Sequence, residues 1–120
     1  MIRSLLAALL ATLAQRGAFD QTFIAAHTAG FAEVAAVLAE VPIEEYAATA
    51  DVPLPLIAQA AEMIMAADRM VVRAELGIQQ GRHSTLNSYL EKLLFLLTGH
   101  FGRHGTNTLH SWLAPLWGNG

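Results

Sequence analysis

One stretch of the sequence, residues 70–76, has the composition of a β-strand, and it constrains the fold more than any other. The β-branched pair Val71 and Val72 favours a strand, and glycines interrupt the chain soon afterwards, at Gly77 and Gly81. A single strand cannot satisfy its own backbone N–H and C=O groups. We therefore expect it to pair with strands outside this sequence or with a second copy of the chain.

The first 67 residues have the periodicity of helices. Leucines at positions 5, 6, 9, 10 and 13 recur at helical spacing and predict a helix over 4–16 that ends at Gly17. Asp20 and Asp51 are expected N-caps, and Pro42 fits a first helical position. The further helices are predicted over 21–26, 31–40, 42–48 and 51–67.

The clearest helix is predicted over residues 84–98, ending at Gly99. Its expected apolar stripe consists of Leu86, Tyr89, Leu90, Leu93, Leu94 and Leu97, and its expected outward residues are Asn87, Ser88, Glu91 and Lys92. Residues 100–120 are rich in glycine and predict an irregular tail. Because this tail carries Trp112 and Trp117, we expect it to lie on another surface.

The composition points to a chain that is covered by more protein. Hydrophobic residues make up 54% of its 120 residues and charged residues only 14%, whereas about 25% is usual. Seven Lys and Arg and a net charge of −3 argue against a nucleic-acid partner. Cysteine is absent, which excludes disulfides and an iron–sulfur cluster held by this chain alone. The compartment is not fixed by these features, although we favour the cytoplasm.

The apolar N-terminus has two interpretations. Residues 4–14 follow Arg3 and could be a secretory leader cleaved near Ala14. The run is far shorter than the roughly 20 apolar residues of a membrane-spanning helix, so no membrane span is expected. We favour a buried helix, because the leucines and the alanines occupy opposite faces.

The loop between the expected strand and the last helix is the best candidate site. A strand, a glycine loop and a helix N-terminus present a phosphate or a heteroaromatic ring to free backbone N–H groups. Gly77 lets a ligand approach the backbone, and the Gln80 amide suits the edge of an aminopyrimidinone ring. Ser84 or Thr85 is expected to cap the helix. The candidate residues of the loop are Gly77, Gln80, Arg82, His83 and Ser84. An ordinary turn with a polar rim is the alternative.

No catalytic or metal-binding set is predicted. His100 and His104 are four residues apart, but Gly99, Gly102 and Gly105 interrupt any helix that would present them together. Glu44 and Glu45 are adjacent, so on a helix their side chains point in different directions.

Several segments follow one family pattern, in order and at matching spacing. They are D-Q-T-F-I-A-A-H-T-A-G-F at 20–31, V-P-I-E-E-Y-A at 41–47, V-P at 52–53, L-G-I-Q-Q at 76–80, L-L-T-G at 96–99 and F-G-R-H-G at 101–105. With these segments the chain resembles the molybdopterin oxidoreductases, which include formate dehydrogenases, periplasmic nitrate reductases and dimethyl sulfoxide reductases. The family often has histidine where this chain has Gly81, and Asn or Gln where it has His100.

The resemblance implies a fold and a cofactor. The chain would be mainly α-helical with one or few strands, an internal fragment of an α/β, Rossmann-like domain. It would be a single partial domain with helices over 1–67, a strand–loop–helix corner over 68–99 and the tail over 100–120. The family binds molybdenum through two molybdopterin guanine dinucleotides, and the matching contact positions here are Leu76 and Gln80. Arg82, His83 and Ser84 are further candidates.

Two functions remain open from the sequence. In the first, the chain binds the cofactor within a parent oxidoreductase, which performs two-electron redox at molybdenum. The family's metal ligand and iron–sulfur cysteines come from segments that have no counterpart here, so the chain alone is not expected to turn over. In the second, the chain is a small helical interaction module that dimerises through residues 70–76 and its apolar helix faces and carries no cofactor.

Overall fold

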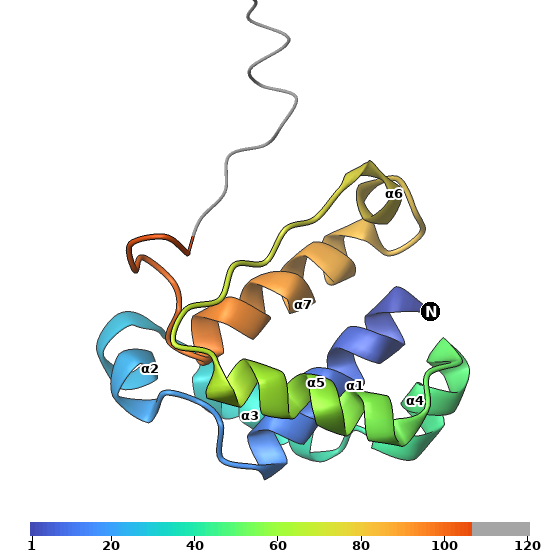
Figure 1. Ribbon diagram of the computed structural model, residues 1–120, viewed down its shortest axis with the longest axis horizontal. Helices are drawn as coiled ribbons and strands as arrows, with labels where there is room; N and C mark the ends of the chain where they lie inside the picture. The colour runs from blue at the N-terminus through green and yellow to red at the C-terminus, as the bar shows by residue number, and fades with distance from the viewer. Residues whose placement is uncertain (107–120) are drawn as a thin grey trace, which may run out of the picture.

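Helix α1 (Ile2–Gln15) is the central helix of the computed structural model, which describes residues 1–106. It packs against α3 (Phe31–Ala39), α4 (Ile43–Ala50), α5 (Leu54–Ala66) and α7 (Ser84–Leu97) (Figure 1). Leu10 and Leu13 are fully buried, and so are the small side chains of Ala8 and Ala11. Helices therefore cover α1 on more than one face, in keeping with a helix that is apolar nearly all round.

Short-range signals place most helix ends. The Asp20 carboxylate accepts a hydrogen bond from the Phe23 N–H at 2.9 Å and caps α2 (Gln21–His27), as predicted. Gly17 and Gly99 follow α1 and α7 with φ of +65° and +76°, a conformation that glycine adopts readily. The Asp20 N–H also donates to the Leu97 carbonyl at 2.8 Å, which ties the start of α2 to the end of α7.

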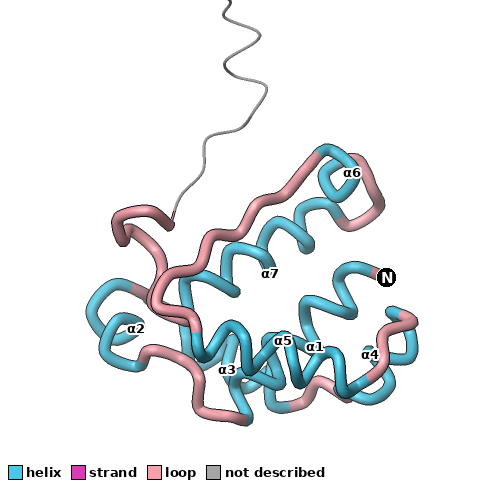
Figure 2. The backbone as a smooth tube through the Cα atoms, in the orientation of Figure 1, coloured by secondary structure: helices cyan, strands magenta, loops and turns pink. Residues whose placement is uncertain are grey.

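The predicted α/β, Rossmann-like fragment is wrong. Residues 1–106 contain seven helices and no strand. Of the strand expected over 70–76, residues 70–75 belong to the connection between α5 and α6 (Leu76–Gln79), and Leu76 begins α6 (Figure 2). Its residues favour an extended backbone, but a strand exists only when a second strand pairs with it, and this part of the chain offers none.

Three further expectations differ from the structure. Asp51 does not cap the following helix: it ends α4 with φ of +56°, and Pro53 precedes α5. Asn87 was expected to face outward but is buried, whereas Leu86 and Tyr89 of the expected apolar stripe are 42% and 50% exposed. The stripe of α7 is therefore rotated toward Leu90, Leu93, Leu94 and Leu97.

Two expectations concern the rest of the chain. The predicted tail begins in the described part with turns over 100–105, but Trp112 and Trp117 lie outside the described residues. Among residues 1–106, no helix combines the length and the apolar character needed to cross a membrane.

Candidate functional site

The predicted cofactor-contacting residues lie in one corner of the molecule, around α6 and the start of α7 (Figure 1). Leu76 and Gly77 belong to the single turn of α6, and Gln80 ends it. Arg82 and His83 form the turn into α7, and Ser84 is its first residue. Five of these six residues are exposed, and Ser84 is half-buried. The corner is thus open to a ligand, although it rises from a helical turn and not from a strand.

The N-terminus of α7 has free backbone donors. His83 occupies the N-cap position with φ of +63°, and no side chain caps the helix, so the expected cap by Ser84 or Thr85 is wrong. The first intrahelical bond runs from the Asn87 N–H to the His83 carbonyl at 2.9 Å. Within the described residues no bond uses the N–H groups of residues 84–86. Such groups at the positive end of a helix favour an anion.

A shallow groove of about 490 Å³ lies beside this corner, and the sequence did not predict it. Its lining residues are Gln79, Ser84, Thr85, Ser88, Tyr89 and Lys92. Gln79 lines this groove and Gln80 does not. The Lys92 Nζ donates to the Ser88 hydroxyl at 2.7 Å, so the groove holds one cation among hydroxyl groups. The spacing of 85, 88 and 92 on one helix face is the signal that could have identified it.

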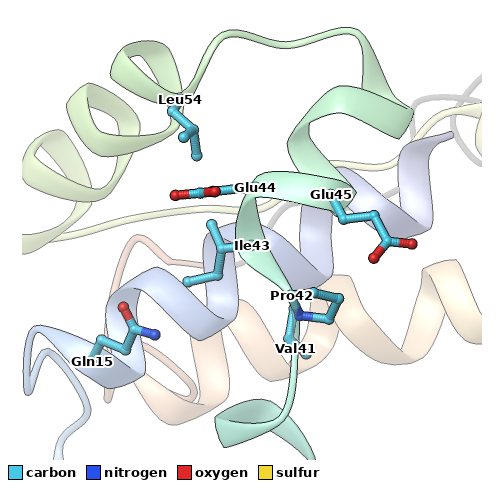
Figure 3. A pocket seen from close by; sticks show the side chains of 7 residues that line it. All are labelled: Gln15, Val41, Pro42, Ile43, Glu44, Glu45 and Leu54. Carbon is cyan, nitrogen blue, oxygen red and sulfur yellow. The ribbon is translucent and has the colours of Figure 1, made fainter.

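A second groove, of about 510 Å³, lies between the end of α1 and the starts of α4 and α5 (Figure 3). It is lined by Gln15, Val41, Pro42, Ile43, Glu44, Glu45 and Leu54. Figure 3 shows the Glu44 carboxylate pointing under Leu54 and the Glu45 carboxylate pointing away from it, as predicted for adjacent helical residues. The described residues that line this groove include no cation or nucleophile, and two diverging carboxylates do not form a catalytic pair.

His100 is a buried polar residue in the segment that the sequence predicted to be an irregular tail. Its side chain is 4% exposed, and its Nδ1 has no hydrogen-bond partner among the described residues. It lines a polar cavity of about 190 Å³ together with Thr98, Arg103 and Asp68. The Arg103 guanidinium donates to the Asp68 carbonyl at 3.2 Å, which ties the turn after α7 to the start of the connection that follows α5.

Burial of His100 lowers the pKa of its imidazole below 6.5, and the Arg103 charge lowers it further, while Asp68 acts in the opposite direction. The unfolded chain therefore binds the proton more tightly than the folded chain. His100 therefore makes its full contribution to the free energy of unfolding above about pH 6.5, and that contribution is lost as the pH falls below this value.

We expect His100→Asn to flatten this dependence of stability on pH, because asparagine does not titrate. The measurement is urea unfolding between about pH 5 and pH 8. His104→Asn, a change of an exposed histidine in the same turn, is the matched control and should keep the wild-type dependence. An unchanged pH dependence in His100→Asn would contradict the assignment.

No metal-binding cluster is found in the described part of the chain: no three His, Asp or Glu side chains among residues 1–106 lie close enough to share an ion. The corner around α6 is the candidate site whose free backbone N–H groups suit an anionic ligand. No protein-family model matches the chain, and no curated protein or solved structure shows significant similarity to it.

Proposed function

We propose that the chain is a cofactor-binding part of a molybdopterin-dependent oxidoreductase of the formate dehydrogenase or nitrate reductase kind. The observation that carries the proposal is the uncapped, exposed N-terminus of α7, preceded by the residues that resemble the family's contact positions. The partner in this proposal is the remainder of the parent oxidoreductase.

The donors of the corner fit a molybdopterin guanine dinucleotide. A pyrophosphate group is recognised by backbone N–H groups at a helix N-terminus and by guanidinium groups. The N–H groups of residues 84–86 and the exposed Arg82 provide both kinds of donor. The exposed amide of Gln80 provides two N–H donors and an acceptor for the edge of a pterin ring.

Space around the corner also fits a flat ligand. A Cβ added to Gly77 would meet no atom within 4 Å, so a ring can approach the backbone there. Leu76 is 58% exposed and offers an apolar contact for the ring. When bound, the cofactor would supply two-electron redox chemistry at molybdenum. The residues of this chain would hold and orient it: Gln80 on the pterin, Arg82 and Ser84 on the phosphates, and His83 at the turn between them.

The proposal is tested by titrating the chain with guanosine diphosphate, which carries the guanosine and pyrophosphate of the dinucleotide. We expect the NMR resonances of the backbone amides of residues 80–86 to shift, with a Kd for guanosine diphosphate roughly in the millimolar range. Arg82→Ala should raise that Kd about tenfold, because it removes a charged donor. Gln59→Ala changes an exposed residue on α5 and is the control.

Two outcomes would contradict this function. One is the absence of any shift at residues 80–86 up to about 10 mM guanosine diphosphate. The other is bound molybdenum with dye-linked turnover by the isolated chain, because we expect the chain alone to lack activity.

The second candidate function is a helical interaction module without a cofactor. The helices bury their own core, yet large apolar side chains such as Leu56, Met63 and Leu76 remain more than half exposed. Exposed apolar surface of this kind is typical of interaction sites. A discrete oligomer together with a negative titration would favour this second candidate.

A further inference from the structure

Four residues of the connection between α5 and α6 have unused backbone groups. The N–H and C=O groups of Met70, Val71, Val72 and Ala74 make no hydrogen bond within residues 1–106. No residue of the connection has a positive φ. Figure 2 shows the connection as an extended segment, and the backbone edge that carries the groups of Met70, Val72 and Ala74 has free donors and acceptors.

Side chains along this connection alternate as they do in a strand. Met70, Val72 and Ala74 are half-buried, and the first two pack against the main core. The residues between them, Val71 and Arg73, are exposed. One face of the connection thus rests on the helices and the other faces solvent, while a strand can still be added at an edge.

We propose that the occupant of this edge is the same segment of a second copy, paired antiparallel about Val72. This inference deepens the second candidate function and does not depend on the cofactor. Free backbone groups in an extended segment form hydrogen bonds with an added strand. The arrangement has two-fold symmetry, so each copy gives and receives the same contacts.

Charge selects this register. Pairing about Val72 places Arg69 opposite the second copy's Glu75, and symmetry makes that pair twice. Within one copy Arg69 lies 3.7 Å from Asp68, and Glu75 forms an ion pair with Arg73. All four side chains are exposed, so these ion pairs are weak and can exchange for the pair between copies. Opposite charges that face each other across strands stabilise the pairing.

Neighbouring registers are less favourable. Pairing about Arg73 would place that guanidinium opposite itself, and pairing about Val71 would place Arg69 opposite the second copy's Arg73. Like charges directly opposite each other destabilise a strand pair. A shift of the pairing register by an odd number of residues would place the half-buried residues of one copy opposite the exposed residues of the other.

The test is a set of charge reversals on the full chain. We expect wild type to dimerise within roughly 10 µM to 1 mM, measured by analytical ultracentrifugation. Glu75→Arg alone and Arg69→Glu alone should each raise the dimer Kd about tenfold. The double variant should have a lower dimer Kd than either single variant, because the pair is then reversed. Glu44→Arg, an equal charge change on exposed α4, is the control and should not alter it.

Hydrogen exchange provides an independent readout. The amides of residues 70–74 should exchange more slowly as the concentration rises through the dimer Kd, because pairing protects them. The proposal is overturned by a monomer across the whole range, by exchange that does not depend on concentration, or by a double variant that is no better than either single one. These outcomes do not depend on the guanosine diphosphate titration, so the two proposals can fail separately.

Discussion

Leu13→Ala is expected to lower the free energy of unfolding by about 3–5 kcal/mol. Leu13 is fully buried on α1, the helix that contacts four others, and it belongs to the main core cluster. Truncation would remove buried apolar area and leave a cavity between α1 and the helices that pack against it. A small domain has only about 5–15 kcal/mol of total stability, so much of it would be lost.

The measurement is urea unfolding followed by circular dichroism. Leu56→Ala is the matched control, because it makes the same chemical change on α5 at a side chain that is 53% exposed. That control should change the free energy of unfolding by no more than about 0.5 kcal/mol. Equal losses in the two variants would show that α1 is not the centre of the core.

The helices that sequence reasoning placed well depend on local signals. The leucine spacing of α1, the Asp20 cap of α2 and the glycines after α1 and α7 act within a few residues of the structure that they determine. Such signals remain legible without knowledge of the rest of the fold. Asp51 was misassigned because an aspartate next to a helix end can also adopt the left-handed conformation that ends the preceding helix.

The strand over 70–76 was wrong because strand formation is not a local property. Val71 and Val72 do favour an extended backbone, and the chain is extended and alternating there. Whether those residues form a strand depends on a second strand, which residues 1–106 do not supply. The composition of the segment was informative about its conformation and not about its pairing.

The site was predictable only in part for a similar reason. The corner residues are consecutive in the sequence, so their proximity needed no tertiary information. By contrast, the burial of His100 depends on the approach of Asp68 and Arg103, which lie 35 residues apart. The rotation of α7 about its own axis also determines that Asn87 is buried and Tyr89 is exposed. The periodicity of the sequence alone did not fix that rotation.

Gly99→Ala is expected to lower the free energy of unfolding by about 3 kcal/mol, for two separate reasons. Its φ of +76° is strained for any residue with a Cβ. An added Cβ would also meet the Asp20 carboxylate and approach the Asp20 Cβ to 2.8 Å. Asp20 cannot move aside easily, because its N–H donates to Leu97 and its carboxylate caps α2.

Two variants separate strain from collision. Gly17→Ala shares the left-handed φ, at +65°, but its Cβ would meet nothing within 4 Å, so it should cost only about 1–2 kcal/mol. In the double variant Asp20→Gly with Gly99→Ala, the colliding side chain is absent, and glycine remains an acceptable N-cap. We expect this double variant to be more stable than Gly99→Ala alone by urea unfolding. If Gly99→Ala costs no more than Gly17→Ala, the close approach of α2 to the end of α7 is not what requires glycine at position 99.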